Sequence, residues 1–199
     1  RWNILANEQL EERKRLPILE YLKFITTGTE HTLRLHVSDR NRNYFGLHNW
    51  QVEEIGSKIY YTRSILDYGK PTKEWLSNRL YQLIRRCSRI KKFAIAGIGE
   101  DTNELLKKAL GDTQIEALEV SRLVQIGDTK RAIITDLLRT HAVRKLIIYF
   151  FLDSWESSRM ADLKQLFTEA IPLLSDRIDF VLSNHGAGAL PRTRWWEAK

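Results

Sequence analysis

The sequence predicts an α/β fold in which units of one strand and one helix follow each other and stack into a curved array. Short apolar strand cores recur along the C-terminal part of the chain, and all but the last are followed by a polar loop and an amphipathic helix. Such a unit cannot bury its apolar face alone, so neighbouring units stack with their strands parallel. The four strand cores are Phe93-Ala94-Ile95, Leu118-Glu119-Val120, Leu146-Ile147-Ile148 and Phe180-Val181-Leu182.

The helices expected beside these strands carry apolar residues at the spacing of one helix face. These residues are Leu76, Leu80, Leu83 and Ile84, then Leu105, Leu106 and Ala109, then Ile133, Ile134, Leu137 and Leu138, and last Met160, Leu163, Phe167, Ala170 and Ile171. The distance between strand cores lengthens along the chain, unlike the strict period of consensus leucine-rich repeats. We therefore predict a leucine-rich-repeat-like array of irregular period.

The competing architecture is a doubly wound sheet, because alternating strands and helices also specify that fold. A parallel sheet that is covered on both faces keeps its strand cores continuously apolar. In this chain Ala94 and Glu119 interrupt two of the cores. The one-sided array is therefore favoured.

The segment before the array is predicted to contain a helical stretch and then a small β-rich unit. Residues 1–24 lack glycine and carry runs of charge that favour a helix, which Pro17 would break or restart. From residue 32 to residue 37 polar and apolar residues alternate, and a second β-rich run ends at Thr62. We expect three parts, at 1–24, 25–70 and 71–199, the last of which ends in a C-terminal cap.

Composition limits the class of protein and its location. The 199 residues are 43% hydrophobic, which is enough for a proper core. The single cysteine, Cys87, excludes an internal disulfide, and the sequence has no Asn-x-Ser/Thr site, so we expect a cytoplasmic or nuclear location. No run approaches the ~20 apolar residues that cross a bilayer, so no membrane contact is expected. The chain begins at Arg1 rather than Met, so we expect it to be part of a longer protein.

The net charge of +7 favours acidic protein surfaces or nucleic acid as partners. Many of the cations lie on one predicted helix and its exit, at Arg79, Arg85, Arg86, Arg89, Lys91 and Lys92. The solvated face of an amphipathic helix accounts for them equally well. An RNA-binding module would combine this helix with the basic and aromatic C-terminal residues, although Glu119 and Asp179 would then oppose the phosphate backbone.

The residues that could carry chemistry do not form a recognisable site. Gly97-Ile98-Gly99 resembles a dinucleotide-binding turn, but Thr102 replaces the third glycine, and Glu100 and Asp101 would repel phosphate. The five histidines show neither the helical spacing nor the cysteine partners of a zinc site. Cys87 lies near an apolar stripe and is interpreted as a buried, inert thiol. We therefore expect a protein that is not an enzyme and that needs no cofactor or metal.

The residues between the core positions of each strand should point to the open face of the sheet, because side chains alternate with period two. The expected outward residues are Lys92, Ala94, Glu119, Lys145, Ile147, Asp179 and Val181. Aromatic residues and arginines often anchor protein interfaces, so Arg122, Tyr149 and Trp155 are added as candidate partner-binding residues. Trp195 and Trp196 could cap the last unit, anchor a partner or stack on single-stranded nucleic acid.

Two stretches carry a resemblance to a known family. Residues 1–10 resemble the last helix of an F-box, which closes with a basic residue, a tryptophan and then a Leu-Ala pair, here Arg1, Trp2 and Leu5-Ala6. The chain that follows is similar to the FTH-type domain of nematode F-box proteins, with a tyrosine-rich strand at Ile59-Tyr60-Tyr61 and a basic strand entry at Ile90-Lys91-Lys92-Phe93.

The resemblance implies a non-enzymatic substrate receptor in a cullin-type ubiquitin ligase. A Skp-type adaptor would then bind through the N-terminal F-box, which includes Trp2, and a protein substrate would bind the exposed strands. An amphipathic helix that packs an aromatic residue would explain Trp2 equally well. A basic RNA-binding module and a general scaffold protein remain the alternative functions.

Overall fold

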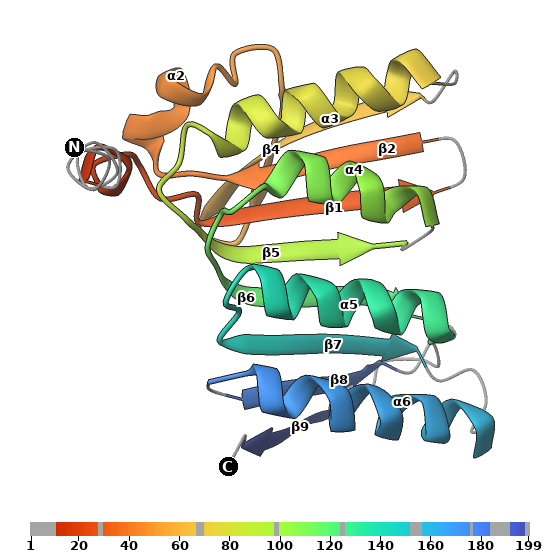
Figure 1. The fold of residues 1–199 in the computed structure, drawn as a ribbon. Helices are drawn as coiled ribbons and strands as arrows, with labels where there is room; N and C mark the ends of the chain where they lie inside the picture. Colours follow the sequence, from red (N-terminus) through yellow and green to blue (C-terminus); the bar gives the residue numbers. More distant parts are fainter. Residues whose placement is uncertain are drawn as a thin grey trace, which may run out of the picture.

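The computed structural model describes residues 11–27, 30–66, 70–97, 100–123, 126–151, 157–175, 177–183 and 192–197. Its strands form one mixed sheet in the order β3-β4-β2-β1-β5-β6-β7-β8-β9 (Figure 1). The strands are β1 Tyr21–Thr27, β2 Glu30–His36, β3 Gln51–Ile55, β4 Lys58–Leu66, β5 Ile90–Ala96, β6 Ile115–Leu123, β7 Lys145–Phe151, β8 Arg177–Ser183 and β9 Arg192–Glu197. The α/β class that the sequence predicts is confirmed.

The central strands run parallel and follow chain order. β1 pairs with β5, and β5 to β8 pair in succession, all in parallel, whereas the strands at the two ends of the sheet pair antiparallel. The four predicted strand cores lie in β5, β6, β7 and β8. The strand order never reverses between β5 and β8, so this region lacks the switch point of a doubly wound sheet.

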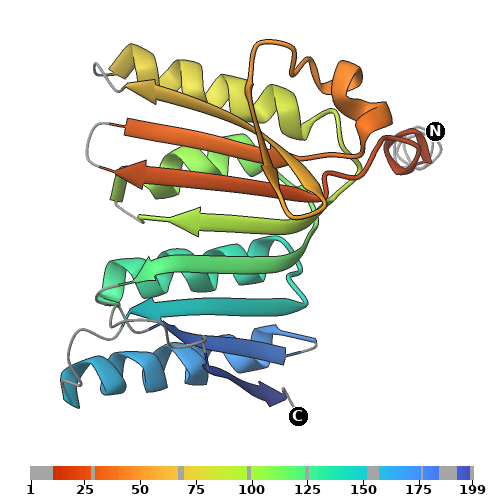
Figure 2. The same cartoon turned by 180° about the vertical axis from the view of Figure 1, so that it is seen from behind.

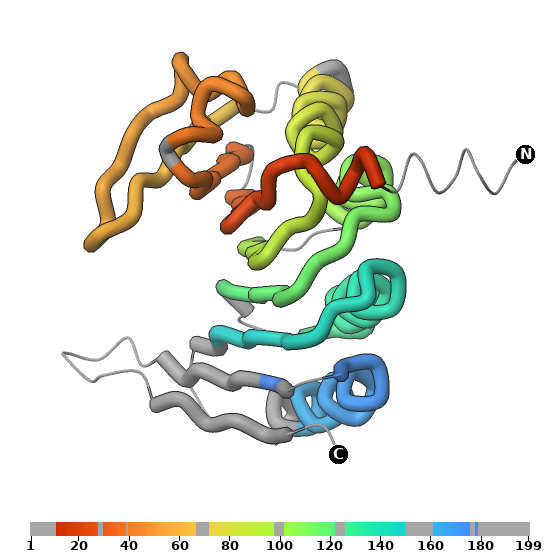
Figure 3. Tube along the Cα trace, turned by 90° about the vertical axis from the view of Figure 1, so that its left-hand side faces the viewer, coloured from red at the N-terminus to blue at the C-terminus, as the bar shows by residue number. Residues whose placement is uncertain are grey.

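The long helices connect the parallel strands and lie on one face of the sheet. They are α3 Lys70–Ile84, α4 Glu100–Leu110, α5 Asp128–Thr140 and α6 Ser157–Ala170, which continues into the short η2 Ile171–Leu173. A shorter pair, η1 Asp39–Asn41 and α2 Arg42–Phe45, follows β2. Figure 2 shows the other face of the sheet, with the long helices behind it. Figure 3 shows the same two layers, the sheet and the helices, viewed along the direction of the strands.

The core fills the space between the sheet and these helices. Inward residues of β5, β6 and β7 are buried as predicted, and they meet the apolar stripes of the helices. The buried strand residues are Phe93, Ile95, Leu118, Val120, Leu146 and Ile148, and the helix residues that face them include Leu76, Leu80, Leu106, Ile134 and Leu166. Phe180 and Leu182 lie in β8, but their side chains are outside the described part of the chain.

The predicted boundary at residue 24 is wrong, because it lies inside β1. The chain is helical from 11 to 14, turns before Pro17, and becomes a strand at Tyr21. The reason is a two-residue alternation in which Leu22 and Phe24 are buried while Tyr21 and Lys23 are half-buried.

The residues from 25 to 70 share their sheet with the strand–helix units that follow. Leu22 pairs with Phe93 and Phe24 pairs with Ile95, so β1 joins the antiparallel strands β2, β3 and β4 to β5. At the other end, β9 pairs with β8 and covers its edge. The N-terminal strands and the strand–helix units therefore build one continuous layer.

Candidate functional site

The open face of the sheet, the face opposite the long helices, is the candidate site (Figures 2 and 3). One row of residues crosses it in register from β1 to β7, namely Lys23, Ala94, Glu119 and Ile147. The backbone register continues to Asp179 in β8 and Trp195 in β9. The backbone register therefore aligns four of the residues that were expected to point outward, namely Ala94, Glu119, Ile147 and Asp179.

The exposure expected for this row differs from what the structure shows. Ala94 is 0% exposed, Glu119 6% and Ile147 8%. Ala94 lies between the long side chains of Lys23 and Glu119 in the neighbouring strands, which accounts for the cover of its methyl group. The residues that remain partly accessible in the adjacent rows are Tyr21, Lys92, Lys145 and Tyr149.

A charge pair between a half-buried lysine and a buried glutamate lies at the centre of the open face. The Nζ atom of Lys92 is 2.6 Å from the Oε2 atom of Glu119. The same ammonium group lies 5.8 Å from the centre of the Tyr21 ring, in a cation–π arrangement. Burial, followed by the negative charge of Glu119, raises the pKa of Tyr21 above its usual value, so this phenol stays protonated and can donate a hydrogen bond.

The β3–β4 hairpin borders the open face and stands out from the sheet on the side away from the helices (Figure 3). The Tyr60 ring meets the Tyr21 ring edge to face, with 5.7 Å between the ring centres. On β2, His36 Nδ1 donates to the carbonyl oxygen of Ile59 at 2.7 Å, and its ring centre lies 5.4 Å from that of Tyr60. Arg34 binds Glu53 of β3 at 2.9 Å. These contacts join the hairpin to Tyr21 and, through the Tyr21 ring, to Lys92.

Sequence reasoning missed five residues of this surface as members of the site, namely Tyr21, Lys23, Arg34, His36 and Tyr60. The alternation around residue 33 placed Leu33 and Leu35 inward, so the same pattern would have placed Arg34 and His36 outward. Tyr21 was missed because its segment was assigned to a helix.

Several predicted site residues, or their side chains, lie outside the described part of the chain. Arg122 lies in β6, Asp179 and Val181 lie in β8, and Trp195 and Trp196 lie in β9, but their side chains are outside the described part of the chain. Trp2 and Trp155 lie outside the described residues altogether. Of the predicted residues, the structure brings together Lys92, Glu119, Lys145, Ile147 and Tyr149 on neighbouring strands.

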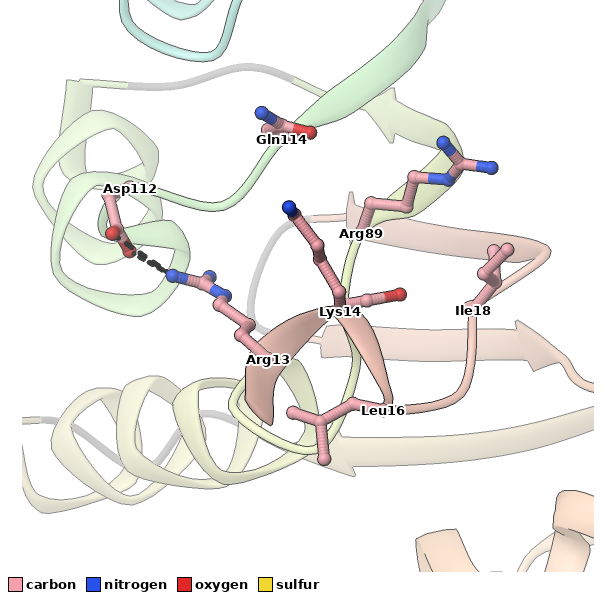
Figure 4. Close-up of a pocket in the computed structure, with 8 residues that line it drawn as sticks. Arg13, Lys14, Leu16, Ile18, Arg89, Asp112 and Gln114 are labelled. Atoms are coloured by element: carbon pink, nitrogen blue, oxygen red, sulfur yellow. Dashed lines mark hydrogen bonds and ion pairs between the residues drawn. The ribbon is translucent and has the colours of Figure 1, made fainter. Parts of the chain in front are cut away.

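A cavity of about 690 Å³ lies at the edge of the sheet where β5 and β6 begin (Figure 4). Its lining includes Arg13, Lys14, Arg89, Asp112 and Gln114. Arg13 reaches across to the carboxylate of Asp112 at 2.9 Å, as the dashed line in Figure 4 shows. Arg89 and Lys14 are also paired, with Glu116 and Glu11 respectively. Because the cations of the cavity already have carboxylate partners, the cavity is not an evident anion site.

Cys87 and Gly97, which the sequence raised as candidates for chemistry or nucleotide binding, have structural roles. Cys87 is buried, as expected, its thiol donates to the Ile84 carbonyl oxygen at 3.0 Å, and burial raises its pKa to about 12. A Cβ atom on Gly97 would lie 2.1 Å from the carbonyl oxygen of Thr26, so close packing against β1 explains this glycine. Among the described residues, no cluster of three or more His, Cys, Asp or Glu side chains could hold a metal ion.

Comparisons with known proteins do not supply a relative for this chain. No family model, curated protein or solved structure matches it. Within the described ranges, no helix has the length and apolar character of a membrane span.

Proposed function

We propose that this chain is a non-enzymatic protein-recognition module that binds a protein partner on the open face of its sheet. The observation that carries the proposal is that the long helices cover only one face of the sheet (Figure 2). The other face presents tyrosines and charged groups. A sheet face left without a helical layer is a surface available to another molecule.

The chemistry of this surface suits a protein ligand. Tyrosine rings offer contact area together with a hydroxyl that can donate, and tyrosines are enriched in interfaces. Tyr21 is held between Lys92 and Tyr60, so little further side-chain entropy would be lost when a partner packs on its ring. The paired charges of Lys92 and Glu119 give the partner a polar pattern to complement.

The proposal extends to a leucine-rich-repeat-like curved array that serves as the substrate-recognition part of an F-box subunit. Support for the array comes from the successive parallel pairing of β5 to β8 with all long helices on one side. Support for the F-box comes from the sequence of residues 1–10, which lies outside the described part of the chain. A Skp-type adaptor would bind that segment, and the complex would act inside the cell.

The experiment uses a longer chain that includes the sequence preceding Arg1, mixed with a purified Skp-type adaptor and cullin. Stoichiometric retention of the adaptor, lost in Trp2→Ala, would support the F-box role. Partner proteins cross-linked to the same chain in cell extract would be compared between Lys145→Glu on the open face and Lys108→Glu on the exposed side of α4. Loss of a partner only with Lys145→Glu supports recognition on the open face, and equal capture by both variants contradicts it.

A second function, binding of single-stranded nucleic acid, is favoured by one observation. Lys23, Lys92 and Lys145 share the open face with Tyr21 and Tyr149, on strands β1, β5 and β7, and bases stack on aromatic rings near basic groups. If the chain captured nucleic acid from cell extract, and if nuclease treatment removed it and its binding weakened steeply as the salt concentration rose, this second function would replace the protein-recognition proposal.

A further inference from the structure

The outermost strand of the sheet, β3, has an edge that no described strand covers. β3 stands first in the strand order and pairs only with β4 among the described strands. All five of its side chains are exposed, with Val52 at 52% and Ile55 at 48%. The hairpin projects from the sheet, so this edge is open to solvent (Figure 3).

The geometry of the hairpin determines which backbone groups face outward. Ile55 pairs with Lys58 across a loop of two residues, and Gly56 has the positive φ of 60° that such tight loops require. The closing pair of this kind of loop exchanges both of its hydrogen bonds, and bonded and non-bonded pairs then alternate along the ladder. Gln51, Glu53 and Ile55 therefore bond to β4, whereas Val52 and Glu54 present their N–H and C=O groups at the free edge.

The edge lacks most of the features that keep natural edge strands from pairing. Lysine, proline and bulges commonly block such edges. β3 contains no lysine or proline, and its register with β4 is continuous. Its remaining protection is the pair of adjacent glutamates, of which Glu53 is bound by Arg34 while Glu54 has no ion-pair partner among the described residues.

The two glutamates of β3 disfavour pairing with a second copy of this chain and favour pairing with a basic strand. Antiparallel pairing of β3 with β3 of a second copy, centred on Glu53, would place the two copies of Glu53 opposite each other, and like charges across a strand pair are destabilising. A strand with lysine or arginine opposite Glu54 and an apolar residue opposite Ile55 would turn this repulsion into attraction. We infer that β3 accepts an extended basic segment of another protein, with alternating apolar residues, as an additional strand of the sheet.

The pairing can be tested with a defined peptide. The probe is a fluorescein-labelled heptapeptide of alternating lysine and valine, and its binding to the chain is measured by fluorescence anisotropy. Glu54→Pro removes an outward N–H at a position where proline is compatible with an edge strand. Because one hydrogen bond and one charge are lost, we expect binding about 10-fold weaker in this variant. Glu54→Gln, which keeps the N–H, should lose less, and Glu104→Gln on the exposed side of α4 should bind like the unmodified chain.

Two control peptides keep the test decisive even where Glu54→Pro disturbs the hairpin. The same peptide with alternate N-methylated residues cannot form the ladder, and a glutamate–valine peptide carries the wrong charge, so neither should bind appreciably. Equal binding of the N-methylated peptide, no binding of the lysine–valine peptide, or full binding by a folded Glu54→Pro variant would overturn the inference. A dimer in gel filtration that Glu54→Pro dissociates would also overturn it, because the occupant would then be a second copy.

Discussion

Lys92 and Glu119 form their 2.6 Å ion pair diagonally across two parallel strands, not between directly opposed residues. Lys92 stands opposite Ala117, whose short side chain leaves room for the lysine to reach the neighbouring position. Glu119 itself stands opposite Ala94. The two alanines thus make space for one buried carboxylate and its partner at the centre of the open face.

Removing the positive partner should destabilise the protein more than removing both charges. Lys92→Met leaves the Glu119 carboxylate buried without that partner. Breaking a fully buried pair costs about 3–5 kcal/mol, and because Lys92 is partly exposed we expect a loss of about 2 kcal/mol. Urea unfolding of Lys92→Met, Glu119→Gln and the double variant would measure the coupling. A double variant that is no more stable than Lys92→Met would contradict this account.

Gly97→Ala should be strongly destabilising, because a Cβ atom there would lie 2.1 Å from a backbone oxygen of β1. The backbone at Gly97 has a φ of 77°, and this left-handed conformation alone costs about 1–2 kcal/mol for other residues. We expect a total loss of more than about 2 kcal/mol in thermal or urea unfolding. Gly127→Ala is the control, because nothing lies within 4 Å of its new methyl group, and it should cost below about 1 kcal/mol.

Cys87 should resist modification as long as the protein is folded. Its thiol is buried, and with a pKa raised to about 12 by desolvation it is almost entirely protonated at pH 8. Reaction with an aromatic disulfide reagent, followed by absorbance, should be slow in buffer and should accelerate through the urea unfolding transition. Since the chain has one cysteine, the signal needs no correction. A rapid reaction without urea would show that the thiol is accessible.

The strand–helix part of the fold could be predicted because each of its elements has a clean period. The apolar positions of β5, β6 and β7 alternate, so the pattern was enough to predict which of their residues face the core. β1 was missed because its alternation from Tyr21 follows a charged helical stretch and Pro17, and because its partner β5 lies far along the chain. Parallel pairing of distant segments leaves no local signal.

The candidate site was predicted in position but not in detail. Alternation is enough to place Lys92 and Glu119 on the open face, but their burial and pairing depend on the register between strands. The contribution of Tyr60 depends on the angle at which the β3–β4 hairpin leaves the sheet, which brings its ring against Tyr21. Neither the diagonal reach of a lysine nor the twist of a hairpin is encoded in a periodic pattern.

Stability should fall as the pH decreases from about 7 to 5, because of His141. This ring is buried, and its Nδ1 donates to the Thr113 carbonyl oxygen at 2.8 Å. Desolvation lowers its pKa below the ordinary value of 6.5, although the hydrogen bond to Thr113 and the charge of Asp136 oppose the change. The unfolded chain therefore binds the proton more readily, and the stability that is fully present above pH 6.5 is lost as the pH falls toward the folded-state pKa.

The free energy of urea unfolding, measured from pH 7.5 to pH 5, tests this expectation while the carboxylates remain largely ionised. His141→Gln retains a side-chain donor for Thr113 but removes the titrating group, so its stability should depend less steeply on pH. His48→Gln is the matched control, because His48 is exposed, and this variant should keep the slope of the unmodified chain. If His141→Gln and His48→Gln gave equal slopes, the acid sensitivity would have to arise from groups other than His141.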